Sequence, residues 1–129
     1  MNQKSEQKLR TVQAKHWGQL TAIDLHKCRS DLLTSASVLS DFCKEICKEI
    51  GMVRYGEPII KRFGEGDLEG YSAMQFIHTS TVVVHLDEFG GRAFIDIFSC
   101  KEFDAENAVN FSKNFFGAEN VKSSTIFRG

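Results

Sequence analysis

Residues 72–100, SAMQFIHTSTVVVHLDEFGGRAFIDIFSC, constrain the fold more than any other stretch of this chain. They contain three short runs rich in β-branched and aromatic residues, at 72–78, 81–86 and 92–100, and such runs predict strands. A cluster of hydroxyl residues separates the first two runs, and an acidic turn with two glycines separates the last two. The rest of the chain is therefore expected to be arranged around three consecutive strands.

Two other segments have the apolar periodicity of amphipathic helices. Apolar residues at three- and four-residue steps predict a first helix that begins within 31–37 and ends at Ile50. A second helix is predicted over 105–116, where Asp104 can cap the first turn and Gly117 can end the last one. Both helices would bury one face.

Further strands are predicted at 17–26, 52–63 and 121–127. Pro58 lies in the second of these, so that strand is expected at a sheet edge or to carry a bulge. The resulting order is β-α-β-β-β-β-α-β. Because strands outnumber helices, we predict an α+β fold: a two-layer sandwich with two helices on one face of a mostly antiparallel sheet.

Both faces of the central strands are expected to be apolar. Val83 and Val84 point to opposite faces, as do Phe94 and Ile95, because successive side chains of a strand alternate. The face without helices would then expose a large apolar patch. We therefore predict a homodimer in which two such sheets pack together.

Size and charge limit the classes of function. A length of 129 residues predicts a single domain, which we place at 17–129. The polar residues 1–16 are expected to form an N-terminal arm. A net charge of −1 provides no basic surface for nucleic acid, and no apolar run reaches the ~20 residues of a membrane helix. With four cysteines and no secretory signal, we expect a reduced, cytoplasmic protein.

Two motifs that could bind ligands are better explained as structure. Cys43 and Cys47 share one face of the first helix, as two metal ligands would, but no second pair of ligands accompanies them. Core packing is the favoured explanation, and no metal is expected. The glycine-rich loop at 64–70 is acidic and would repel phosphate, so we interpret it as a surface loop or a lid.

Three chemically capable residues lie on or beside the central strands: Ser80, His85 and Cys100. Taken singly, each is more typical of structure than of catalysis. A serine among threonines is common in turns, a histidine on a valine-rich strand usually forms a hydrogen bond, and a cysteine after an apolar run is usually buried.

Taken together, these residues resemble the prokaryotic-type S-adenosylmethionine decarboxylases. That family has a self-cleaving serine, a histidine five residues later, a glycine-containing turn, and an apolar strand ending in a cysteine twenty residues after the serine. Ser80, His85 and Cys100 reproduce this spacing, and Ser72 occupies the place of a second family serine. The resemblance extends over about residues 17–129.

The resemblance implies a pyruvoyl enzyme of polyamine synthesis. Ser80 would attack the carbonyl of Thr79, and cleavage between them would leave a pyruvoyl group at position 80. His85 would accept a proton and Ser72 would support the ester during this processing. Cys100 would donate a proton during decarboxylation.

Two substrate contacts are implied as well. Phe63 matches the phenylalanine that precedes a glycine-containing loop in the family, and Glu88 matches an acidic residue of the family sequence HTWPE, which reads HLDEF here. Thr79 and Thr81 flank Ser80 where the family has Glu and His.

Three functions remain open on this evidence. The leading hypothesis is decarboxylation of S-adenosylmethionine for spermidine synthesis. The second is a pyruvoyl decarboxylase of a smaller amino acid such as ornithine or arginine. The third is an uncleaved homologue that acts as a binding or regulatory subunit.

Overall fold

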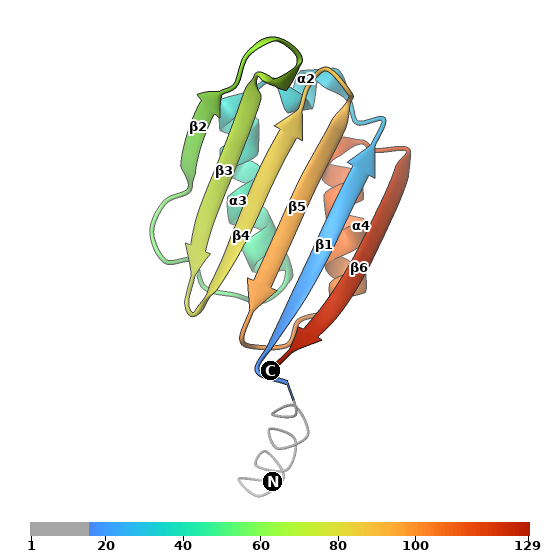
Figure 1. The fold of residues 1–129 in the computed structure, drawn as a ribbon. Helices are drawn as coiled ribbons and strands as arrows, with labels where there is room; N and C mark the ends of the chain where they lie inside the picture. Colours follow the sequence, from blue (N-terminus) through green and yellow to red (C-terminus); the bar gives the residue numbers. More distant parts are fainter. Residues whose placement is uncertain (1–15) are drawn as a thin grey trace, which may run out of the picture.

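The computed structural model describes residues 16–129 as a two-layer α+β sandwich, in which helices cover one face of a six-stranded sheet (Figure 1). In chain order the strands are β1 (Gly18–His26), β2 (Ile59–Phe63), β3 (Gly70–Ile77), β4 (Ser80–Asp87), β5 (Arg92–Ser99) and β6 (Asn120–Arg128). The helices are α2 (Ser30–Leu33), α3 (Ala36–Glu49) and α4 (Ala105–Phe116), with a single 3-10 turn, η1 (Gly66–Leu68).

The sheet has the spatial order β2-β3-β4-β5-β1-β6, and all its neighbouring strands are antiparallel. The three strands predicted within 72–100 are β3, β4 and β5, and they lie side by side in the middle of the sheet. The predicted fold class is therefore confirmed. Residues 1–15, most of the predicted polar arm, lie outside the described residues.

The predicted helices are present, with one correction. A single helix was expected to begin within 31–37, but two helices occur there, because Ser35 leaves the helical conformation and caps α3 by accepting a hydrogen bond from the Val38 amide at 3.2 Å. The α4 bounds are as predicted: the Asp104 carboxylate accepts from the Asn107 amide, and Gly117 takes the left-handed conformation with φ +62°.

The predicted strand at 52–63 is too long. Only Ile59–Phe63 forms a strand, β2, and the preceding segment is irregular apart from one isolated bridge between Arg54 and Ile77. Gly56 has φ +84° and Pro58 has no amide hydrogen to donate, so neither supports a continuous ladder. The strand that remains lies at the sheet edge, as Pro58 predicted.

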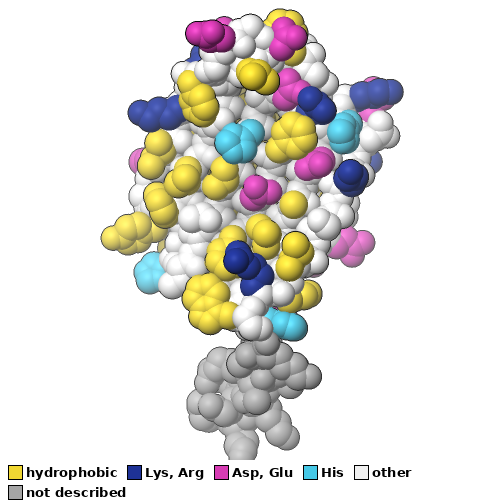
Figure 2. Space-filling view, in the orientation of Figure 1, with side chains coloured by type: hydrophobic (Ala, Val, Ile, Leu, Met, Phe, Trp, Pro, Cys, Tyr) yellow, Lys and Arg dark blue, Asp and Glu magenta, His cyan; other side chains and the backbone are white. Residues whose placement is uncertain are grey.

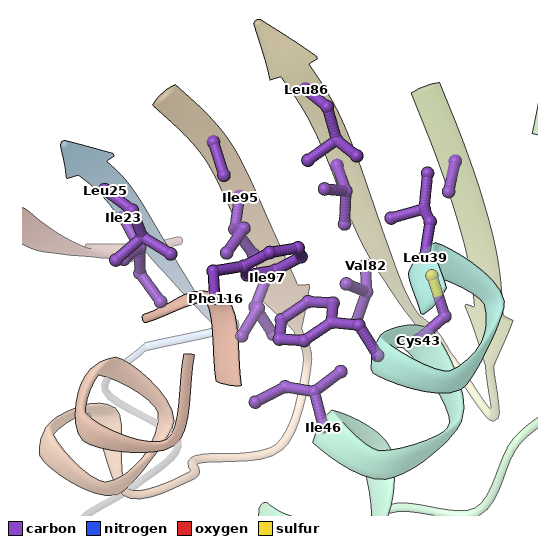
Figure 3. Close-up of a cluster of buried hydrophobic side chains, with 14 of the residues drawn as sticks. Ile23, Leu25, Leu39, Cys43, Ile46, Val82, Leu86, Ile95, Ile97 and Phe116 are labelled. Carbon is purple, nitrogen blue, oxygen red and sulfur yellow. The ribbon is translucent and has the colours of Figure 1, made fainter. Parts of the chain in front are cut away.

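The hydrophobic core lies between the sheet and the long helices (Figure 3). Phe42 of α3 and Phe116 of α4 meet in its centre, with ring centroids 4.9 Å apart. Cys43 and Cys47 point into this core and are 0% and 1% exposed, which confirms that they pack as apolar side chains. None of the helices that the structure describes is long and apolar enough to cross a membrane.

The other face of the sheet carries no helix and is called the open face here (Figure 1). Many of its side chains are apolar and exposed, with histidine and acidic residues among them (Figure 2). The exposed apolar residues whose strand register places them on the open face are Ile59, Phe63, Met74, Phe76 and Ile126. The histidine and acidic side chains of this face are thus surrounded by exposed apolar side chains.

Candidate active site

The turn between β3 and β4 consists of only two residues, His78 and Thr79, because Ile77 and Ser80 form the last pair of the ladder. Thr79 has φ +65°. The left-handed region costs a residue with a Cβ roughly 1–2 kcal/mol, and a β-branched side chain makes it rarer still. The peptide bond between Thr79 and Ser80 therefore follows a strained residue.

Ser80 begins β4 with its side chain turned toward the helices, on the same face as Val82. The residue is 7% exposed, and its Oγ has no hydrogen-bond partner among residues 16–129. A buried hydroxyl without a partner costs about 1–3 kcal/mol and calls for an explanation. The oxygen belongs to the residue that directly follows the Thr79 carbonyl.

Cys100 lies directly opposite Thr79, one step beyond the end of the β4–β5 ladder. Ser80 pairs with Ser99 in the register, so the next positions in each direction are Thr79 and Cys100. The Cys100 Sγ is 2.9 Å from the Thr79 Oγ1 and donates to it. The thiol is half-buried beside the turn.

A second pair lies on the open face, farther along the same strands. Ser72 of β3 and His85 of β4 are register partners, and the Ser72 Oγ is 2.9 Å from the His85 Nδ1. Both side chains are accessible. An imidazole held by a neighbouring hydroxyl can accept or donate a proton at its other nitrogen.

The two pairs do not meet within one chain. Ser80 and His85 are five residues apart on one strand, so their side chains point to opposite faces and their backbones are about 16 Å apart. The turn that holds Thr79 and the end of β5 lie at one end of the central strands (Figure 1), and His85 lies near the other end of β4, two residues before Asp87. The four predicted residues thus fall into two groups: Ser80 and Cys100 near the β3–β4 turn, and Ser72 with His85 farther along the strands.

A pocket of about 540 Å³ opens beside His85. Phe94, the register partner of His85, forms one wall, and Leu68 of η1 and Phe89 of the β4–β5 turn contribute further apolar surface. Three carboxylates and one guanidinium also line it: Asp67, Glu69, Asp87 and Arg92. The pocket falls within the volume range of small-molecule sites and suits a cationic ligand with an apolar body.

The predicted substrate contacts lie near this pocket but do not line it. Phe63 is 60% exposed at the end of β2. Glu88 is paired with Arg62, whose Nη1 and Nη2 donate to the two carboxylate oxygens at 2.9 and 3.2 Å. Arg62 also donates to Glu69 at 3.1 Å, so it ties the 64–70 loop to the β4–β5 turn.

Charges around the pocket are stabilised by these ion pairs. The hydrogen bonds from Arg62 hold the pKa of Glu88 below its usual value, and Glu88 in turn raises the pKa of Arg62. Burial pushes the pKa of Asp87 upward, but the Gly90 amide and the Arg92 guanidinium outweigh it and leave that pKa lowered. Asp87 and Glu88 are therefore ionised at neutral pH, each paired with an arginine.

A second cavity, of about 440 Å³, adjoins the turn itself. Its lining residues are Gly51, Met52, Val53, Ile77, His78, Thr79 and Lys101. A cavity is thus present beside the strained turn, at the end of strands β3 and β4.

Several residues of these sites were not predicted from the sequence. The strain at Thr79 and its contact with Cys100 depend on the register of the strands, which no local pattern specifies. Phe89 and Phe94 carried a signal as aromatic residues flanking the acidic turn, but the pocket forms only when the 64–70 loop folds over them.

Comparisons with known proteins agree with this architecture. The sequence pattern of a family described as S-adenosylmethionine decarboxylase matches residues 19–129. Among solved structures, the adenosylmethionine decarboxylase of Aquifex aeolicus superposes with a TM-score of 0.74 at 14% sequence identity, covering 88% of this chain and 92% of that one. A comparison with curated protein sequences gave no significant match.

Proposed function

The chain belongs to the S-adenosylmethionine decarboxylase family, and from this premise we propose that it cleaves itself between Thr79 and Ser80 and then decarboxylates S-adenosylmethionine. The observation that carries the proposal is the Ser80 hydroxyl, which is buried and has no hydrogen-bond partner among the described residues. A structural serine at this depth would be expected to form a hydrogen bond. An unpaired oxygen next to a strained peptide suits a nucleophile.

Cleavage follows from bonds of this chain alone. The Ser80 Oγ attacks the Thr79 carbonyl carbon, and the peptide C–N bond breaks as an ester C–O bond forms. Loss of the Ser80 α-proton then expels the Oγ with the acyl group, so Thr79 gains a free carboxylate. Water finally replaces the nitrogen of residue 80, which leaves as ammonia.

The left-handed conformation of Thr79 supports this sequence of steps. With φ +65°, the residue carries strain of roughly 1–2 kcal/mol that the intact turn maintains. Breaking the peptide bond removes the constraint on the Thr79 backbone, so its φ can relax while its hydroxyl stays against Cys100. Relief of strain therefore favours the cleaved product.

The pyruvoyl group expected from this cleavage fits the surroundings of Ser80. That residue is its source, and its own hydroxyl has no partner among the described residues. When present, the group supplies an electron sink for decarboxylation of an amine substrate. Cys100 follows Ser99, the register partner of Ser80, and so its thiol is placed to donate a proton near position 80.

We further propose that the enzyme is a homodimer that shares its active site. Within one chain, Ser80 and His85 lie about 16 Å apart along β4. If two open faces pack with their strands antiparallel, the backbone of the β3–β4 turn of one protomer, which carries Thr79 and leads into residue 80, meets the His85 end of the other. The exposed apolar residues of the open face supply a surface for this packing (Figure 2).

In this arrangement His85 accepts the α-proton of the partner's residue 80, and Ser72 orients the imidazole through the 2.9 Å hydrogen bond. The Ser72 hydroxyl is also available to support the ester. Both side chains are accessible on the open face, as the proposal requires.

The substrate is proposed from the pocket beside His85. Phe89 and Phe94 offer aromatic surface for a flat ring, and the carboxylates attract a positive charge. S-adenosylmethionine carries both a purine and a sulfonium. We place Phe63 and Glu88 at the margin of this pocket, where Glu88 becomes available to substrate only after Arg62 releases it.

The substrate assignment is tested by carbon dioxide release from carboxyl-labelled S-adenosylmethionine, ornithine and arginine. The proposal predicts release from S-adenosylmethionine alone. It also predicts that Phe94→Ala raises the KM at least several-fold while cleavage proceeds normally. Phe127→Ala, a change of an exposed phenylalanine on the edge strand β6, should leave the KM unchanged. Preferred turnover of ornithine or arginine would overturn the assignment.

A further inference from the structure

The contact between Cys100 and Thr79 has a defined direction. The Thr79 hydroxyl donates its hydrogen to the carbonyl oxygen of His78. Its oxygen therefore has only lone pairs to offer to the Cys100 sulfur, 2.9 Å away. The hydrogen of this contact comes from the thiol, so the chain of donors runs from Cys100 through Thr79 to His78.

The backbone creates this contact. Thr79 and Cys100 are opposite one another because Ser80 pairs with Ser99, and the left-handed φ of Thr79 directs the end of the turn. Asparagine or glycine would meet the same φ at lower cost. Threonine adds a hydroxyl on a side chain whose branched Cβ restricts rotation.

We propose that Thr79 is a positioning residue for Cys100: its hydroxyl accepts the hydrogen of the thiol and holds the sulfur beside position 80. The catalytic importance of this contact rests on the proposed function, in which the Cys100 thiol is the proton donor. Neither side chain is consumed when the peptide bond breaks. The hydrogen bond therefore links the fragment that ends at Thr79 to the fragment that contains Cys100.

The contact can be tested without cleavage or turnover. In a Ser80→Ala background, the reaction of Cys100 with iodoacetamide is followed by peptide mapping and mass spectrometry. Burial raises the pKa of Cys28, Cys43 and Cys47 to about 11, 12 and 11, so these thiols react slowly near neutral pH and do not obscure the signal.

Two variants of Thr79 distinguish protection of Cys100 by the hydrogen bond from protection by the size of the Thr79 side chain. Thr79→Val keeps the branched Cβ and removes the hydroxyl, so Cys100 should react about fivefold faster, the effect of losing one ordinary hydrogen bond. Thr79→Ser keeps the hydroxyl and should react at the parent rate. The proposal is overturned if the valine variant reacts at the parent rate, or if the serine variant reacts as fast as the valine variant.

This result is independent of the proposed function, because the background protein cannot be cleaved at Ser80. A failure of cleavage in the parent chain would refute the enzyme hypothesis and leave the alkylation rates interpretable. A failure of the alkylation prediction would refute the role of Thr79 and leave cleavage to be judged separately.

Discussion

The Oγ of Ser72 lies 2.9 Å from the Nδ1 of His85, on the face of the sheet opposite to the one that holds the Ser80 side chain. This pairing makes His85 an oriented imidazole on an accessible surface. It also leaves His85 about 16 Å along β4 from residue 80 of its own chain, although the proposed role of His85 is to accept the α-proton of a residue 80. The proposed active site therefore depends on a second protomer that packs against the open face.

Replacing His85 with alanine should slow self-cleavage by roughly 100-fold or more, the usual contribution of a positioned acid or base. The measurement is the time course of fragment formation on denaturing gels. His26→Ala, a change of another histidine at the last residue of β1, should cleave at the parent rate. Parent-like cleavage of His85→Ala would remove His85 from the mechanism.

The shared site makes a separate prediction about mixed dimers. A His85→Ala chain and a Ser80→Ala chain with different tags are co-expressed, and heterodimers are isolated through both tags. The His85→Ala chain retains Ser80 and receives His85 from its partner, so it should be cleaved in the heterodimer at up to the parent rate. An uncleaved heterodimer would show that His85 does not act across the interface.

The strain at Thr79 should appear in stability measurements. In the Ser80→Ala background, Thr79→Gly should be about 1 kcal/mol more stable to urea than Thr79→Val, because glycine accepts φ +65° and valine does not. Both variants lack the hydroxyl, so the hydrogen bond to Cys100 cancels in the comparison. Equal stability would mean that the turn stores no strain.

Alkaline pH should destabilise the fold through buried thiols. Burial, and secondarily the neighbouring Cys47, raise the pKa of Cys43 from 9.0 to about 12. Above pH 9 the unfolded chain loses this proton and the folded chain keeps it, so stability is fully present below pH 9 and falls as pH rises toward 12. The slope is roughly 1.4 kcal/mol per pH unit for each such thiol.

Urea unfolding between pH 8 and pH 11 measures this slope. Cys43→Ala should reduce the slope by roughly 1.4 kcal/mol per pH unit, the contribution of one thiol. Ser112→Ala, which alters another fully buried side chain, should not change the slope. An unchanged slope in the Cys43→Ala variant would contradict the burial argument.

The fold was largely predictable because its signals are local. The apolar periodicity over 105–116, with Asp104 before it and Gly117 after it, predicted both the first and the last residue of α4 correctly. The strand at 52–63 was overestimated because apolar residues there were weighed above Gly56 and Pro58, whose backbones do not support a ladder.

The site was less predictable because it depends on register and faces. Spacing identified Ser72, Ser80, His85 and Cys100, but it does not reveal that Ser80 and His85 point in opposite directions until β4 is known to be regular. The contact between Thr79 and Cys100 arises from pairing across twenty-one positions of sequence, which no motif describes.

The central claim is that Ser80 cleaves the chain, and intact-mass spectrometry of the purified protein tests it most directly. The parent chain should yield fragments 1–79 and 80–129, the second with a blocked, ketone-bearing N-terminus. Ser80→Ala should remain a single species of 14.5 kDa. Ser112→Ala, which removes another buried hydroxyl that has no partner among the described residues, should cleave like the parent. A parent chain that stays at 14.5 kDa after prolonged incubation would contradict the account.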